Sequence, residues 1–132
     1  MNSVIDVSGA IEILFQKEKS KKFCKALENT ELITAPDLYI CELTNTLWKY
    51  YKAKILSHDE CIKFIQDGIN LVEYFFPCIE MWQEALSEGI SCGHSIYDMY
   101  YMITARRNGA VLITNDSELA SICRKNNVKI CC

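Results

Sequence analysis

Short β-prone runs alternate with longer helical patterns along the whole chain, and this alternation constrains the fold more than any other feature. The strand-like runs cover residues 3–7, 32–35, 71–76, 110–114 and 128–130. Strands separated by helices form a mostly parallel sheet covered by those helices, because each crossover returns the chain to the same edge. The pattern therefore predicts an α/β fold.

The segments between these runs carry the start and stop signals of helices. Residues 36–54 have apolar side chains at helical spacing, with Pro36 in the first turn. Residues 57–60 read Ser-His-Asp-Glu, a capping box for a helix that runs to residue 70. Further helices are expected over residues 79–88, 96–108 and 117–126, the first two ending at Gly89 and Gly109, where a left-handed residue often follows a helix.

Length and composition indicate one soluble domain, residues 1–132, with half of its residues hydrophobic. No apolar stretch approaches the roughly 20 residues of a membrane helix, and Asp6 interrupts what would be the apolar part of a signal peptide. We therefore expect a cytoplasmic protein with no membrane contact. The net charge of −3 argues against tight, indiscriminate binding to nucleic acid but does not exclude a nuclease.

Eight cysteines lie far apart, apart from the terminal pair Cys131 and Cys132, and no Cys-x-x-Cys motif occurs. With only two histidines in the chain, a zinc site would need ligands from distant segments. We expect free thiols, most of them buried as small hydrophobic side chains in a reducing compartment. The terminal pair is expected to be exposed, and no role is assigned to it.

Two acidic residues follow predicted strands. Asp6 comes after the first apolar run and Asp116 after the fourth. An open α/β sheet binds ligands outside the carboxyl ends of its strands, where the strand order changes direction. If these two strands are neighbours, both acids lie at one edge together with Ser8, Thr114 and Asn115, which outlines a site for a hard cation.

Asp98 is the most informative single residue, because residues 96–105 form a helix that is apolar nearly all round. Burying an unpaired carboxylate costs several kcal/mol. The position therefore predicts a cation or hydrogen-bond donors nearby. The alternative is a structural capping box formed by Ser95 and Asp98.

Glu42 shares a helical stripe with Asn45, Thr46 and Lys49. Alone it is most simply a surface residue or the partner of Lys49 in an ion pair. Only the other acids of the chain make it a candidate for the site.

The remaining candidates also have structural alternatives. Asp6 is suited to a turn in which Ser8 caps the next helix, and Asp116 is suited to an N-cap. His58 falls in a capping turn, while His94 is either a loop residue or a substrate contact. The chain offers no pair of nucleophile and base that competes with the acids.

Convergent carboxylates repel one another, so four of them stay ionised at neutral pH only with divalent cations. Mg²⁺ or Mn²⁺ fits, since both are hard, prefer oxygen ligands and leave positions for water and phosphate oxygens. Such an ion can orient and acidify a water for in-line attack on a phosphodiester. Metal-dependent phosphodiester hydrolysis is therefore the predicted chemistry.

The chain resembles the PIN-domain ribonucleases, specifically the toxins of VapBC-type toxin-antitoxin pairs. The resemblance covers nearly the whole chain and rests on four acidic blocks in order: SVIDVS at residues 3–8, APDLYICELTN at 35–45, HSIYDMYY at 94–101 and LITNDSEL at 112–119. No single block is specific, but the four together are.

The resemblance implies a single PIN domain with a three-layer α/β/α fold and a parallel five-stranded sheet. It implies a catalytic quartet of Asp6, Glu42, Asp98 and Asp116. Within this quartet, Asp6, Asp98 and Asp116 would bind Mg²⁺ or Mn²⁺, and Glu42 would act more through water. Ser8, Thr114 and Asn115 would orient water or ligands.

The implied activity is Mg²⁺-dependent cleavage of RNA (tRNA, rRNA or mRNA) by the toxin of a type II VapBC system. The implied partners are a cognate antitoxin that blocks the acidic site and a second copy of the chain in a homodimer. Residues 49–54, with three lysines and two tyrosines, would line an RNA path or a partner groove, or else simply end an amphipathic helix.

Three other readings compete with this one. A phosphoacceptor receiver domain normally has paired acids at the first strand and a lysine beyond the last, whereas Lys129 lies inside the predicted last strand. A haloacid-dehalogenase-like phosphatase needs Asp-x-Asp, whereas residues 6–8 read Asp-Val-Ser. A catalytically inactive PIN-fold module that only binds a protein remains the alternative, and the intact quartet argues against it.

Overall fold

The computed structural model describes residues 1–132 and contains one five-stranded, all-parallel sheet of order β3-β2-β1-β4-β5. The strands are β1 (Ser3–Ile5), β2 (Ile33–Pro36), β3 (Tyr74–Phe76), β4 (Val111–Ile113) and β5 (Ile130–Cys131). The helices are α1 (Val7–Leu14), α2 (Ser20–Glu28), α3 (Leu38–Lys52), α4 (His58–Asn70), η1 (Cys78–Glu80), α5 (Trp82–Cys92), α6 (Ile96–Arg107) and α7 (Ser117–Lys125). The predicted α/β class is confirmed.

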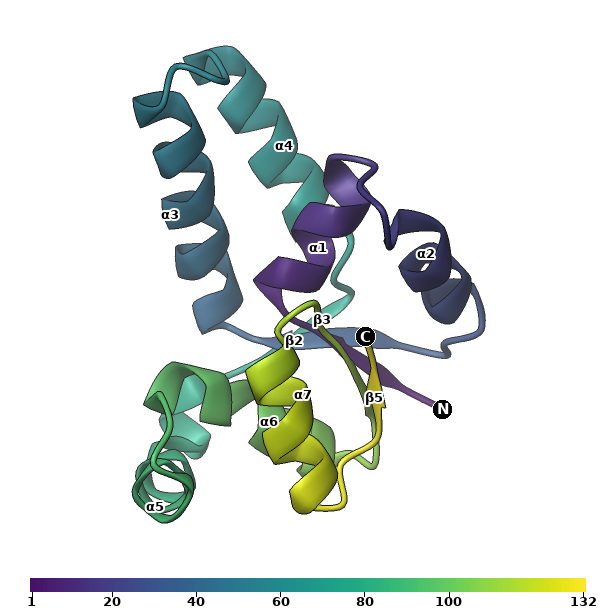
Figure 1. Ribbon diagram of the computed structural model, residues 1–132, viewed down its shortest axis with the longest axis vertical. Helices are drawn as coiled ribbons and strands as arrows, with labels where there is room; N and C mark the ends of the chain where they lie inside the picture. The colour runs from purple at the N-terminus through teal and green to yellow at the C-terminus, as the bar shows by residue number, and fades with distance from the viewer.

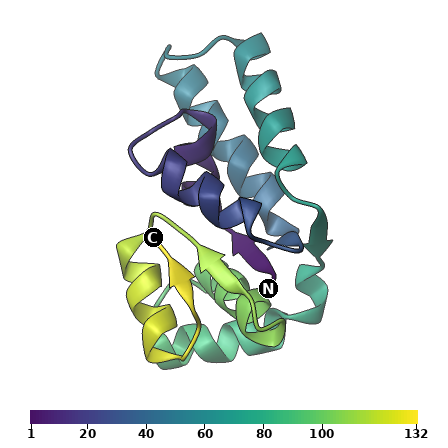
Figure 2. The same cartoon turned by 90° about the vertical axis from the view of Figure 1, so that its right-hand side faces the viewer.

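The helices cover the sheet in two layers. In Figure 1, α1 to α4 lie above the sheet and α5 to α7 below it, and the view in Figure 2 shows the same separation. The helices α3 and α4 form a long hairpin whose turn lies far from the strands. The three-layer α/β/α arrangement with a parallel five-stranded sheet is therefore confirmed.

The strands are short and apolar because helices bury both of their faces. Val4 and Ile5 of β1 and Leu112 and Ile113 of β4 are all completely buried. In the register of the two strands, Ile5 lies opposite Ile113. The residues that follow these two positions therefore emerge side by side at the carboxyl edge of the sheet.

The strand order changes direction at β1. From β1 the chain first adds β2 and then β3 on one side, and later adds β4 and β5 on the other. The first and fourth strands are therefore neighbours, as the candidate site requires. This is the topological position at which open α/β sheets bind ligands.

Several element boundaries differ from the prediction. Pro36 is not in the first turn of a helix; it ends β2, where it lies opposite Phe76 of β3, and α3 begins at Leu38. The first strand stops at Ile5 because Asp6 caps α1. The third strand begins at Tyr74, three residues later than expected.

The helix ends are partly as predicted. The Ser57–Glu60 capping box is confirmed at the start of α4, and Gly109 follows α6 with a φ of +57°. Gly89 does not end a helix; α5 continues to Cys92 and Gly93, with a φ of +62°, takes that place. Gly89 is needed for packing instead, since a Cβ there would collide with the Ile96 side chain.

All eight cysteines are free thiols, as predicted, but the expectation that most are buried is wrong. Only Cys61 and Cys123 are buried, and Cys41 on α3 is exposed. Cys131 and Cys132 are only partly exposed. None of the helices combines the length and the apolar character needed to span a bilayer.

Candidate active site

Asp6 ends the first strand and begins the first helix at the centre of the sheet. Its Oδ1 accepts hydrogen bonds from the Gly9 amide at 2.8 Å and the Ser8 hydroxyl at 2.7 Å. Its Oδ2 accepts from the hydroxyl of Thr114, directly after β4. The residue is 6% exposed, and burial raises the pKa of Asp6 to about 6 despite these three hydrogen bonds, which favour the ionised form.

Two hydroxyl groups connect Asp6 to the loop after β4. Ser8 Oγ lies 3.2 Å from Thr114 Oγ1 and accepts a hydrogen bond from the Asn115 amide at 2.8 Å. Thr114 Oγ1 accepts one from the Asp116 amide at 3.0 Å. The structure thus joins Ser8 and Thr114 to Asp6 directly, whereas Asn115 takes part through its backbone.

Asp116 caps α7, so the structural alternative for this residue is correct. Its Oδ1 accepts hydrogen bonds from the amides of Glu118 at 3.0 Å and Leu119 at 3.1 Å. The cap uses one oxygen, and no protein donor reaches Oδ2. Asp116 can therefore serve as a helix cap and as a ligand at the same time.

Asp98 lies in the first turn of α6 and is held by a histidine. Nε2 of His94 is 2.7 Å from Asp98 Oδ2, and Nδ1 of His94 is 3.3 Å from Glu118 Oε1. The capping-box alternative is wrong, since Ser95 makes no side-chain capping hydrogen bond. Burial and the charge of Asp116 both raise the pKa of Asp98. The hydrogen bond from His94 lowers it, but the net direction is upward.

His94 itself is shaped by its two acidic neighbours. Burial lowers the pKa of the His94 imidazole, but the hydrogen bonds and negative charges of Asp98 and Glu118 outweigh that effect, so the pKa is raised. The side chain is only 10% exposed. His94 is therefore an integral part of the acidic site.

Glu42 extends from α3 toward α6, where Tyr101 donates a hydrogen bond to its Oε1 at 2.6 Å. Tyr101 is 1% exposed and lies three residues after Asp98 on α6. The partner of Glu42 is thus the Tyr101 hydroxyl. It is not Lys49, the partner that the surface alternative required. Burial raises the pKa of Glu42, and the charge of Asp98 raises it further.

Electrostatic interactions connect the four acids through Asp98. The charge of Asp98 raises the pKa of both Asp6 and Glu42, and the charge of Asp116 raises the pKa of Asp98. Interactions of this kind are largely screened beyond about 10 Å. The fold therefore gathers the quartet at the carboxyl edge of β1 and β4, while its catalytic role stays a prediction.

The donor set suits a hard divalent cation, because carboxylate oxygens are the ligands that Mg²⁺ and Mn²⁺ prefer. Glu42, Asp98 and Asp116 each keep one oxygen without a protein donor, and none of these atoms is buried away from solvent. No three aspartate, glutamate, histidine or cysteine side chains lie close enough together to hold one ion. The chemistry fits such an ion, and side chains would have to shift to share it.

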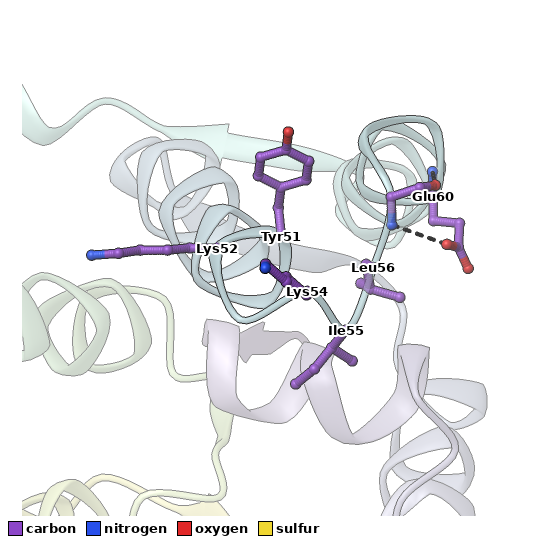
Figure 3. Close-up of a pocket in the computed structure, with 7 residues that line it drawn as sticks. Tyr51, Lys52, Lys54, Ile55, Leu56 and Glu60 are labelled. Atoms are coloured by element: carbon purple, nitrogen blue, oxygen red, sulfur yellow. Dashed lines mark hydrogen bonds between the residues drawn. The ribbon is translucent and has the colours of Figure 1, made fainter.

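Residues 49–54, the lysine- and tyrosine-containing run, lie away from these acids at the end of the α3–α4 hairpin. A cavity of about 510 Å³ lies there, and its lining includes the residues labelled in Figure 3: Tyr51, Lys52, Lys54, Ile55, Leu56 and Glu60. Tyr51 and Ile55 are more than half exposed. Tyr51, Lys52 and Lys54 of the run therefore line a cavity separate from the acidic site, whereas Tyr50 contacts Lys17.

Comparison with known families agrees with this architecture. The family model described as "PIN domain" matches residues 3–125, nearly the whole chain. The chain belongs to the PIN-domain family. The match includes all four acids and both strands that position Asp6 and Thr114.

Relatives of this PIN domain include a named ribonuclease. The chain is 26% identical over 125 residues to "Ribonuclease VapC3" of Pyrobaculum aerophilum, an alignment that covers 91% of this chain and 93% of that protein. Two solved structures share the PIN fold. PAE2754 from Pyrobaculum aerophilum superposes with a TM-score of 0.76 at 20% identity, covering 98% of this chain and 83% of that one. FitAcB from Neisseria gonorrhoeae superposes with a TM-score of 0.64 at 14% identity, covering 97% and 95%.

Sequence reasoning missed three residues of this PIN-domain site. Tyr101 carries a hydroxyl group within a buried apolar helix, and a buried hydroxyl usually needs a hydrogen-bond partner. This need was the sequence signal that could have indicated a role for Tyr101. Glu118, in the first turn of α7, was not among the candidate residues, although it contacts His94. Gly9 was also missed: a Cβ there would lie 2.9 Å from the Ile113 carbonyl oxygen, so glycine allows α1 to pack against β4.

Proposed function

We propose that this protein is a metal-dependent ribonuclease that acts as the toxin of a type II VapBC-type pair. The observation that supports the proposal is the position of Asp6 at the switch point of a PIN-domain sheet, together with the charge interactions that link Asp98 to Asp6, Glu42 and Asp116. The 26% identity to "Ribonuclease VapC3" supports the choice of RNA as the substrate.

Each residue of the site has a role in the proposed hydrolysis. Asp6, Asp98 and Asp116 would hold Mg²⁺ or Mn²⁺, as divalent metals are generally used by PIN-domain ribonucleases. Such an ion would bind phosphate oxygens and lower the pKa of a water molecule. Asp6 is kept in place for this task by the hydroxyl groups of Ser8 and Thr114.

Glu42 is suited to act on water rather than on the ion. Tyr101 fixes its Oε1, which leaves Oε2 available to a water molecule. Because burial and Asp98 raise the pKa of Glu42, it is a better proton acceptor near neutral pH than an ordinary carboxylate. The exposed side chain of Asn115 at the same edge is available to orient water or substrate.

A cognate antitoxin is the proposed protein partner. The end of the α3–α4 hairpin exposes Trp48, Tyr51 and Ile55, each at least half exposed, beside the cavity of Figure 3. Exposed aromatic side chains around a hollow are typical of protein interfaces. This surface supports the binding of one segment of an antitoxin, and a further segment of that partner would have to reach the acidic site in order to block it.

A homodimer in the cytoplasm is the proposed working form. The outer face of α5 exposes Trp82, Leu86 and Ile90 at a spacing of four residues, with Ile79 just before it. A continuous apolar stripe of this kind is the usual mark of an interface. We propose this stripe as the contact between two copies of the chain.

The direct test is incubation of the purified protein with structured RNA in the presence of Mg²⁺ or of a chelator. Cleavage is expected with Mg²⁺ and should disappear with the chelator or with Asp98→Asn. An exposed acid on another face, Glu31→Gln, is the matched control and should keep full activity. Absence of cleavage in any RNA tested, together with retained binding of the antitoxin, would leave the inactive binding module as the better account.

A further inference from the structure

A second polar cavity adjoins the acidic quartet. It has a volume of about 340 Å³, and its polar lining comes from Ser8, Glu12, Lys17, Glu42, Thr46 and Asn115. Ser8, Glu42 and Asn115 belong at the same time to the candidate active site. The volume falls within the roughly 300–1,000 Å³ of small-molecule sites. A group bound here would therefore lie directly beside a phosphate held at the acids.

Glu12 is the unusual member of this cavity. The residue is 6% exposed, yet its carboxylate accepts no hydrogen bond and forms no ion pair within the chain. Its oxygens still reach solvent, since no buried side-chain oxygen or nitrogen is left without a partner. Glu12 thus offers an unused acceptor pair to whatever enters the cavity.

Lys17 supplies a cation on the rim of the same cavity. Its side chain is exposed and forms no salt bridge, and its one hydrogen bond is a long contact of 3.5 Å to the Tyr50 hydroxyl. The amine is therefore available to a phosphate. The two carboxylate oxygens of Glu12 lie inside the cavity, and the amine of Lys17 lies at its rim. This arrangement matches a nucleotide, whose base carries hydrogen-bond donors and whose phosphate is anionic.

We propose that this cavity binds the base of the nucleotide next to the scissile phosphate and selects guanine through Glu12. This inference rests on the proposed ribonuclease function and adds its base preference. Lys17 binds the phosphate of the same nucleotide. Single-stranded RNA is commonly read in this way, by hydrogen bonds to the Watson–Crick edge of an unstacked base.

The chemistry of the four bases leads to guanine. A carboxylate accepts two parallel hydrogen bonds best, and guanine presents two adjacent donors, N1–H and N2–H, on one edge. Cytosine and adenine each present one amino donor beside an acceptor nitrogen, which would repel the second carboxylate oxygen. Uracil presents one imino donor between two carbonyl groups. Only guanine satisfies both oxygens of Glu12.

The first test compares cleavage of a randomised RNA pool by the wild type, Glu12→Gln and Glu18→Gln. Sequencing of the products should show guanine enriched at one position beside the cut for the wild type. Glu12→Gln should reduce this enrichment about tenfold, as expected for loss of a bidentate contact. Glu18→Gln removes an exposed charge from the loop that follows α1 and should change nothing. Enrichment of another base, or of guanine equally in Glu12→Gln, would overturn the proposal.

A second test does not depend on cleavage. Binding of GMP, AMP, CMP and UMP is measured in chelator by NMR titration of the full chain. GMP should bind tightest to the wild type and lose its advantage in Glu12→Gln, whereas Lys17→Met should weaken all four about equally. Equal affinities in the wild type would refute the guanine site even if RNA is cleaved. An intact GMP preference without cleavage would instead refute the ribonuclease. Thermal unfolding of each variant checks that the fold is retained.

Discussion

Nε2 of His94 lies 2.7 Å from Oδ2 of Asp98, so a residue two positions before α6 holds the acid of the first turn of that helix. Partners of this kind orient a ligand and typically change metal affinity or activity by about 10–100-fold when removed. We expect His94→Ala to lower RNA cleavage at least tenfold and to weaken Mn²⁺ binding, measured by calorimetry without RNA. His58→Ala, an exposed histidine on α4, is the control. Unchanged Mn²⁺ affinity in His94→Ala would show that the pair has no positioning role.

Asp6 makes stability depend on pH. Its pKa is raised from 3.8 to about 6, so between these values the folded protein holds a proton that the unfolded chain has released. The protonated form therefore favours folding, and this contribution is lost as pH rises from about 4 through about 6. Asp6→Asn, which carries no charge, should raise the free energy of unfolding at pH 7.5 by roughly 2 kcal/mol.

The measurement for Asp6→Asn is urea unfolding in metal-free buffer at several pH values. The gain over the wild type should be small at about pH 4 and should grow up to about pH 7. A constant difference across this range would contradict the raised pKa. Added Mg²⁺ should stabilise the wild type more than Asp6→Asn, because only the native carboxylate binds the ion strongly.

Tyr101→Phe removes the hydroxyl that holds Glu42 at 2.6 Å and leaves the aromatic ring in the core. The loss of one hydrogen bond should lower stability by about 1 kcal/mol. The rate of cleavage should fall several-fold more than the affinity for uncleaved RNA, because Glu42 is proposed to act in the reaction step. Tyr100→Phe on the same helix is the control. A variant with weaker RNA binding and unchanged turnover would place Tyr101 in substrate binding instead.

Gly9→Ala should be destabilising although the position is helical. Alanine in place of glycine normally stabilises a helix by about 1 kcal/mol, but here the new Cβ would lie 2.9 Å from the Ile113 carbonyl oxygen. Moving α1 away from β4 would also loosen the hydrogen bonds of Asp6 with Gly9 and Thr114. We expect a loss of roughly 1–3 kcal/mol in urea unfolding. A variant as stable as the wild type would show that α1 can shift freely.

The sequence determined the class of the fold, because that class depends on local patterns, and it offered the four acids as candidates for the site. Alternation of β-prone and helical segments fixes a parallel sheet, and an acid directly after a strand must lie at its carboxyl edge. The Ser57–Glu60 capping box and the N-cap at Asp116 are likewise complete within a few residues. Local signals failed at Pro36 and Gly89, where contacts with β3 and with Ile96 overrode them.

Only the tertiary structure decided how the acids are held. Asp6 and Thr114 are 108 residues apart in the chain, and Glu42 and Tyr101 are 59 apart; no sequence period links such pairs. The strand order that makes β1 and β4 neighbours brings the first pair together. The second pair links α3 and α6, which belong to opposite helix layers, through the hydroxyl group of Tyr101. Burial within the fold raises the pKa values of Asp6, Glu42 and Asp98, because desolvation depends on every element that covers a side chain and not on the residue itself.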